Sequence, residues 1–148
     1  MMTDITDFRG LVAADHGLVV VSTLRADGSV QSTVVNAGVL PHPVGGHEVV
    51  AFVIRGGTRK LANLRERPRA TVTIRAGWQW VTAEGPVELA GPADPLHGLG
   101  PEGVRWLLRD VFTAAGGEHD DWADYDRVMA SEGRTAVLLT PDRVYSNP

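Results

Sequence analysis

The feature that most restricts the fold of this chain is a series of short apolar, β-branched segments separated by turns. Residues 18–24 form such a segment, Asp27-Gly28 follows as a typical hairpin turn, and residues 30–35 are apolar again. Further segments of this kind lie at 48–54, 70–74, 78–84, 87–89, 135–139 and 143–145. No regular alternation of strands and long helices appears, as a parallel sheet would require. The pattern predicts a mainly β fold, a small antiparallel barrel built from hairpins.

The remaining apolar periodicity predicts a few short helices outside this barrel, at 8–15, 59–67, 104–115 and 120–129. Between the strands and the third helix lies a loop, 91–103, that contains three prolines. No internal repeat or composition shift divides the 148 residues, so we expect one domain, 1–148.

Composition excludes several classes of protein. A formal net charge of −4 argues against general nucleic-acid binding, and no apolar run approaches the ~18 residues that a membrane span requires. The absence of cysteine excludes disulfides and thiol catalysis. The first ten residues lack the charged-then-apolar pattern of a signal peptide, so a cytoplasmic location is expected.

The strongest local signal is Gly56-Gly57-Thr58-Arg59-Lys60, which contains the only lysine of a chain with thirteen arginines. It follows a predicted strand and opens a predicted helix, for which Thr58 is the expected N-cap. Cations in the first turn oppose the helix dipole, whereas free N–H groups beside two cations suit an anion such as phosphate. The alternative is a solvated basic helix after a tight turn. The spacing matches neither a Walker A motif nor a Rossmann fingerprint.

Positive charge is concentrated around this element. Seven of the fourteen basic residues lie within 55–75, where Glu66 is the only acidic residue. A local basic surface on an acidic protein indicates a discrete anionic ligand rather than a long polyanion.

Two other patterns have competing interpretations. Trp78 and Trp80 flank Gln79 and point to one face of a strand, either in a core or dimer interface or as a wall against a planar ring. The run 118–121, Glu-His-Asp-Asp, is better explained as a helix cap than as a metal site, because sequential residues cannot all turn to one point. No Ser-His-Asp set is evident, so we expect any chemistry to be carried by a cofactor and no metal to be bound.

With these elements placed, the chain resembles the pyridoxamine phosphate oxidase-like family of FMN-binding split β-barrels. It is most similar to an actinobacterial branch, the deazaflavin (coenzyme F420)-dependent reductases. The resemblance rests on five segments, in order along the chain: 23–28, Thr-Leu-Arg-Ala-Asp-Gly; 58–69, from Thr-Arg-Lys to Pro-Arg; Trp78 with Ala83-Glu84-Gly85; 117–122, Gly-Glu-His-Asp-Asp-Trp; and the terminal Arg143-Val144-Tyr145.

The resemblance implies a homodimer with cofactor clefts between the subunits. It implies that Arg59 and Lys60, with Thr58 beside them, hold the cofactor phosphate. The ring would lie against Thr33, Val34, Val35, Val53 and Ile54, and the cleft would be closed by Trp78, Gln79 and Trp80 of either the same or the other subunit. The implied reaction is hydride transfer from reduced F420 to an unidentified small electrophile. An FMN-dependent oxidase-like enzyme and a non-catalytic F420- or flavin-binding protein are the alternatives.

Overall fold

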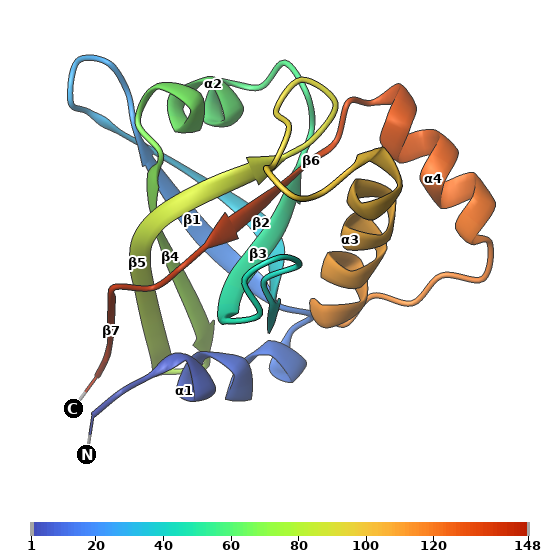
Figure 1. The fold of residues 1–148 in the computed structure, drawn as a ribbon. Helices are drawn as coiled ribbons and strands as arrows, with labels where there is room; N and C mark the ends of the chain where they lie inside the picture. Colours follow the sequence, from blue (N-terminus) through green and yellow to red (C-terminus); the bar gives the residue numbers. More distant parts are fainter. Residues whose placement is uncertain (1, 148) are drawn as a thin grey trace.

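A closed antiparallel barrel forms the body of the molecule, as Figure 1 shows. The computed structural model describes residues 2–147. Strand order is β4-β1-β2-β3-β6-β5-β7, and an additional β4–β5 pairing closes the barrel. The strands are β1 (Leu18–Leu24), β2 (Val30–Pro41), β3 (Glu48–Ile54), β4 (Arg69–Ala76), β5 (Gln79–Ala90), β6 (Thr135–Leu139) and β7 (Arg143–Ser146). The predicted split-barrel class is confirmed.

Two strands of twelve residues, β2 and β5, each change partner along their length. The first part of β2 pairs with β1 and the rest with β3, while β5 passes from β4 to β6. The changes occur near Gly38 and Gly85, where a Cβ would lie 2.4 Å from the carbonyl carbon of Ala114 and 2.1 Å from the carbonyl oxygen of Thr140. Only glycine permits these backbones to approach so closely.

The sequence analysis placed strand ends at these two positions, and this was wrong. We predicted that the second strand covers 30–35, and that 78–84 and 87–89 are separate strands around Gly85-Pro86. Both strands instead continue through the change of partner. A Gly-Pro pair is a turn signal when only its neighbours in sequence are considered, but here it allows a strand to bend between two ladders.

Helices cover the ends and one flank of the barrel (Figure 1): α1 (Ile5–Gly10), the 3-10 turn η1 (Val12–Ala14), α2 (Arg59–Glu66), α3 (Pro101–Ala114) and α4 (Trp122–Ser131). The predicted helix at 8–15 begins earlier, because Asp4 forms a capping box with Asp7, and it breaks before η1. The start of α3 is also earlier than predicted, with Pro101 in its first turn, where proline is favoured. Within residues 2–147 no helix is long and apolar enough to cross a membrane.

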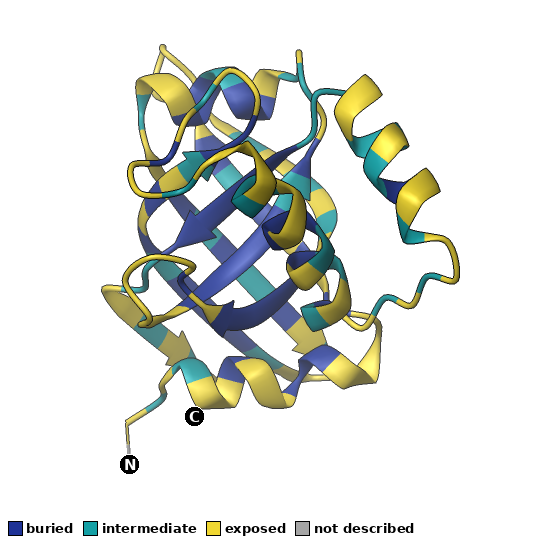
Figure 2. Cartoon of the chain, turned by 45° about the vertical axis from the view of Figure 1, so that its right-hand side comes forward, coloured by how far each residue is buried: buried dark blue, intermediate teal, exposed yellow. Residues whose placement is uncertain are grey.

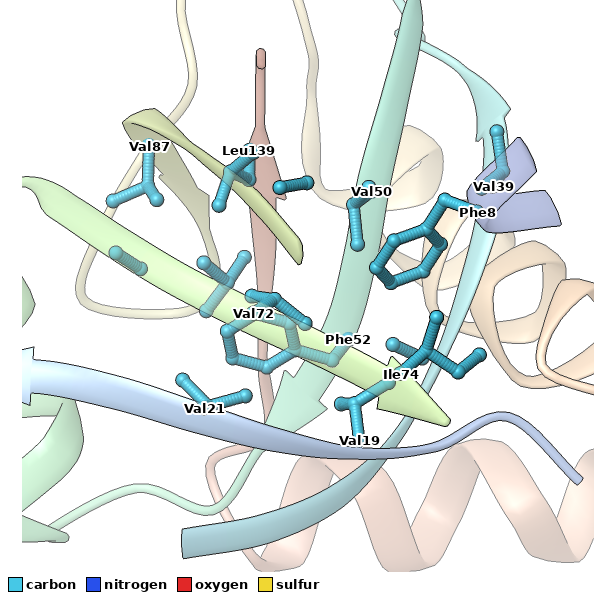
Figure 3. Packing of buried hydrophobic residues seen from close by; sticks show 14 of the residues in the cluster. Phe8, Val19, Val21, Val39, Val50, Phe52, Val72, Ile74, Val87 and Leu139 are labelled. Carbon is cyan, nitrogen blue, oxygen red and sulfur yellow. The ribbon is translucent and has the colours of Figure 1, made fainter. Parts of the chain in front are cut away.

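Two groups of buried apolar side chains hold this arrangement. Phe8, Phe52, Val72 and Ile74 belong to the group that fills the barrel (Figure 3). The second group lies between the outer side of the β3–β6 region and α3. β3 and β6 are mainly buried and the other strands mix buried with exposed positions, whereas α4 is largely exposed or half-buried (Figure 2). Tyr125 is its only buried side chain, so this helix is attached to the body by few apolar contacts.

An apolar strip remains on the outer face of β1 and β2. Val20 and Val34 are direct cross-strand partners, as are Leu24 and Val30, and all four are at least 43% exposed. Leu18 extends the strip along β1 and is 40% exposed. Between the two apolar pairs, on the same face, lies the pair Ser22–Ser32, whose hydroxyls are 2.9 Å apart. Outward-facing apolar residues on neighbouring strands are a common mark of a protein interface.

The barrel interior is expected to provide most of the stability. Phe52 is fully buried, so Phe52→Ala should lower the free energy of unfolding by about 3–5 kcal/mol. The matched change Val44→Ala, at a half-exposed turn position, should lower it by less than about 0.5 kcal/mol. Urea unfolding of both variants checks this, and equal losses would contradict the assignment of the core.

Candidate cofactor site

The start of α2 has the local structure that the sequence predicted. Thr58 is extended, and its hydroxyl oxygen accepts a hydrogen bond from the Leu61 N–H at 3.3 Å. The same hydroxyl donates to the Arg55 carbonyl at 3.0 Å, so Thr58 is engaged in the cap. Arg59 and Lys60 therefore occupy the first turn of the helix, as predicted.

The side chain of Lys60 lies across the surface of β2. Its Nζ donates to Thr33 Oγ1 at 2.8 Å, and the residue is only 8% exposed. The structure thus brings together two residues that are 27 positions apart and that the resemblance assigns to one cofactor. Among residues 2–147, no ion pair with a carboxylate is found for Lys60.

Burial lowers the pKa of the Lys60 amine below the ordinary value of 10.5, and the positive charge of Arg134 lowers it further. Both causes disfavour the charged amine in the absence of a nearby anion. A phosphate beside Nζ would act in the opposite direction and stabilise the charged form. The amine is therefore placed where an anion would lower its energy.

Much of the basic surface around α2 is already neutralised, contrary to expectation. Arg65 binds Asp94 through two hydrogen bonds of 2.8 and 2.7 Å. Arg69 binds Asp142 in the same way at 2.7 and 2.8 Å, which lowers the pKa of Asp142. The charges of these two arginines are therefore balanced by carboxylates of the chain itself.

Other arginines remain around an open hollow beside α2. Arg25 from the β1–β2 turn, Arg59 and Arg67 line this hollow of about 640 Å³, together with Asp27 and Glu66. Arg67 Nε donates to the Leu24 carbonyl at 2.9 Å, which fixes its guanidinium beside the β1–β2 turn. Arg25 is a member of this group that the sequence analysis did not foresee.

An apolar cavity of about 470 Å³, called here the sheet–helix cavity, lies between the barrel and the two long helices. Three of the predicted ring-contacting residues line it, namely Val34, Val35 and Val53. The remaining walls come mostly from α3, α4 and the segment between them: His16, Asn36, Val111, Phe112, Ala115, Gly116, Gly117, Tyr125, Met129 and Arg134. Its volume and apolar character are typical of small-molecule sites.

Two of the predicted ring contacts are placed differently. Ile54 is 2% exposed, its side chain belongs to the barrel core, and it does not line the cavity. Thr33 does not line the cavity and instead accepts the hydrogen bond from Lys60. Neighbouring residues on a strand point to opposite faces, which separates Ile54 from Val53.

The tryptophan pair lies at the other end of β4. Trp78 lies in the β4–β5 turn and is 95% exposed. Trp78 and Gln79 both line an open hollow near the N-terminus. The Trp80 ring contacts Tyr145 edge-on, with centroids 6.1 Å apart. Because the eight residues of β4 span about 25 Å, this pair does not close the α2 site within one subunit.

The acidic run before α4 acts as a helix cap, as predicted. Asp121 Oδ1 accepts from the Asp124 N–H at 3.1 Å, and His119 Nδ1 accepts from the Asp121 N–H at 3.0 Å. Over residues 2–147, no group of three or more potential metal ligands was found.

Sequence reasoning missed the part of the cavity wall formed by α4 and the strand after it. Tyr125, Met129 and Arg134 line the cavity, and the Tyr125 hydroxyl donates to the Leu108 carbonyl at 3.0 Å. Burial raises the pKa of Tyr125 to about 12. The signal available was the aromatic spacing of Trp122 and Tyr125 on one helix, which indicates a packed face but not what it faces.

The fold is a closed antiparallel barrel in which two long strands change partner. A profile of the family described as pyridoxamine 5'-phosphate oxidase matches residues 9–147, so the chain belongs to this family. Among solved structures, a conserved hypothetical protein from Mycobacterium tuberculosis is similar, with TM-score 0.70, 18% identity, and coverage of 99% of this chain and 85% of that one.

Two further similar structures differ in what their names say they bind. One is named F420 reductase, with TM-score 0.62, 14% identity, and coverage of 93% of this chain and 94% of that one. The other is a pyridoxamine 5'-phosphate oxidase-related, FMN-binding protein from Nostoc punctiforme, with TM-score 0.65, 12% identity, and coverage of 96% and 80%. At these identities the likeness establishes the fold.

The buried amine leads to a pH-dependent prediction. At pH values between the lowered pKa of Lys60 and 10.5, the unfolded chain binds more protons than the folded one. The free energy of unfolding therefore rises with pH in this range. Lys60→Met removes this group. The wild type should therefore gain stability relative to Lys60→Met as the pH rises through that window, as measured by urea unfolding at several pH values.

Arg59→Met is the matched control, because it removes a neighbouring cation and retains Lys60. It should show the same rise as the wild type. Parallel pH profiles for the wild type and Lys60→Met would show that the amine is not desolvated.

Proposed function

We propose that the chain is an oxidoreductase that binds coenzyme F420 and reduces a small organic electrophile. The single observation that carries the proposal is the largely buried Lys60 amine, hydrogen-bonded to Thr33 in the first turn of α2. Membership of the pyridoxamine 5'-phosphate oxidase family and the similarity to a structure named F420 reductase support it.

The residues present fit such a cofactor. Lys60 and Arg59 would hold its phosphate, with Thr58 fixing the helix start, because the desolvated amine gains most from an adjacent anion. The ring would lie in the sheet–helix cavity against Val34, Val35 and Val53. When bound in its reduced form, the deazaflavin supplies a hydride. The apolar walls would exclude water and align the electrophile.

We further propose that the active form is a homodimer. The exposed apolar strip of β1 and β2 is suited to a second copy, and Trp78 is almost fully exposed at the end of β4 distant from α2. In a dimer, the partner subunit's Trp78 and Trp80 would be available to close the cleft. This would give the tryptophan pair the ring-wall role that one subunit alone does not permit.

An FMN-dependent enzyme is the second candidate, and the similarity to the FMN-binding protein favours it. An oxidase acting on a phosphorylated substrate would need a second basic cluster. Arg143, near the C-terminus, is paired with Glu84 at 3.3 Å. A non-catalytic binding protein is the third candidate, distinguished by retention of F420 without its oxidation by quinones, enones or tetrapyrroles.

Cofactor preference and the role of Lys60 are tested together by fluorescence titration with F420 and with FMN. Lys60→Ala should weaken F420 binding by about 1.5–3 kcal/mol, the range for a charge-assisted hydrogen bond. Arg65→Ala is the control, because Arg65 is a nearby cation held by Asp94. Tighter binding of FMN would favour the second candidate, and unchanged affinity in Lys60→Ala would refute the phosphate site.

The dimer is tested by mass in solution. Val20→Arg places a charge in the middle of the apolar strip and should convert a dimer into monomers, because burying an unpaired charge is costly. Val44→Arg, at an exposed turn position away from the strip, should leave the dimer intact. Size-exclusion chromatography with light scattering measures both, and a monomeric wild type would refute the proposal.

A further inference from the structure

A second apolar cavity, of about 400 Å³, lies between α3, α4 and the loop before α3, and it shares Met129 and Arg134 with the sheet–helix cavity. We name it the α3–α4 cavity. Its walls come from the loop before α3, from α3 itself, from α4 and from Arg134: Gly91, Pro92, Pro95, Leu99, Gly100, Pro101, Val104, Arg105, Leu108, Asp126, Met129, Ala130 and Arg134. Figure 1 shows that loop running above the barrel into α3, with α4 beyond it.

We propose that this cavity is a binding site for a small, uncharged apolar molecule that carries a carbonyl group. The walls are largely hydrophobic, and Pro92 and Pro95 in the loop and Pro101 at the start of α3 restrict the backbone, which favours a preformed shape. The volume lies within the usual range for small-molecule sites.

The charges at the rim indicate that the ligand is uncharged. Asp126 is held by Arg109, with Nε to Oδ1 at 2.9 Å, and lies 3.7 Å from Arg105. Arg105 also pairs with Glu102, and Arg134 pairs with Glu132 at 3.0 Å. Three cations and three carboxylates thus balance one another. An anionic or cationic ligand would have to disrupt a pair, which costs more than leaving it intact.

One donor at the rim gives the site its polar contact. Arg134 uses Nε and Nη2 for Glu132, and within residues 2–147 no protein acceptor is found for its remaining nitrogen, Nη1. An uncharged carbonyl oxygen can accept from this nitrogen without displacing Glu132. A ligand with an apolar body and one carbonyl therefore matches both features of the cavity.

The helix α4 connects the two cavities. This helix is held by the Asp126–Arg109 pair and by the Tyr125 hydroxyl, and Gly116 and Gly117 lie in the connection before it. Met129 and Arg134 line both cavities. An occupant of the α3–α4 cavity would therefore contact two residues that also form the wall of the sheet–helix cavity.

The test uses Prodan, a fluorescent uncharged naphthyl ketone, with the full-length protein free of cofactor. Ala130 lines only the α3–α4 cavity, and Val34 lines only the sheet–helix cavity. Ala130→Phe should weaken Prodan binding about tenfold or more by filling the site, whereas Val34→Phe should leave an affinity within about twofold of the wild type. Unlabelled 2-acetylnaphthalene should displace the probe, and anionic 2-naphthoate should not.

Circular dichroism establishes that each variant is folded, and Ala130→Met replaces Ala130→Phe if the larger side chain prevents folding. The proposal is overturned if the wild type does not bind Prodan, if binding is lost in Val34→Phe instead, or if 2-naphthoate competes as well as the ketone. These outcomes are independent of F420 binding.

Discussion

The closed barrel depends on β2 and β5, each of which pairs with one strand along its first part and with another along the rest. The change of partner occurs near Gly38 in β2 and near Gly85 in β5. At these glycines the backbone of Ala114 or of Thr140 lies so close that a side chain would not fit. Without these crossings, the β1–β4 part of the sheet would not join the β3–β6 part into a closed barrel. Closure removes the open sheet edges that a flat sheet of these strands would expose.

The candidate site follows from this closure. The crossing of β2 at Gly38 brings that strand against the end of α3, and its preceding residues, Thr33 to Val35, lie between α2 and the helical flank. A lysine at the start of a short helix can therefore reach a hydroxyl on β2, and an apolar cavity forms beside it. The hydrogen-bond partner of the buried Lys60 amine and two residues of the cavity wall, Val34 and Val35, are thus consecutive on β2.

Features determined by neighbouring residues were predictable from the sequence. The Thr58 cap, the position of Lys60 in the first turn and the Asp121 cap all depend on groups within four residues, and each was confirmed. Features that depend on residues far apart in the sequence were not predictable from it. The pairs Arg65–Asp94 and Arg69–Asp142 span 29 and 73 residues, and no local pattern indicates them. The same reason explains the misplaced strand ends, which depend on Ala114 and Thr140.

The central claim, that Lys60 is a desolvated amine awaiting an anion, has a direct test, because it is the only lysine. Protein labelled with 13C at the lysine side chain would give a single Cε resonance whose pH titration reports one pKa by NMR. The account predicts a pKa below 10.5 in the free protein and a rise on addition of F420 or FMN. A pKa at the ordinary value, unchanged by either ligand, would contradict it.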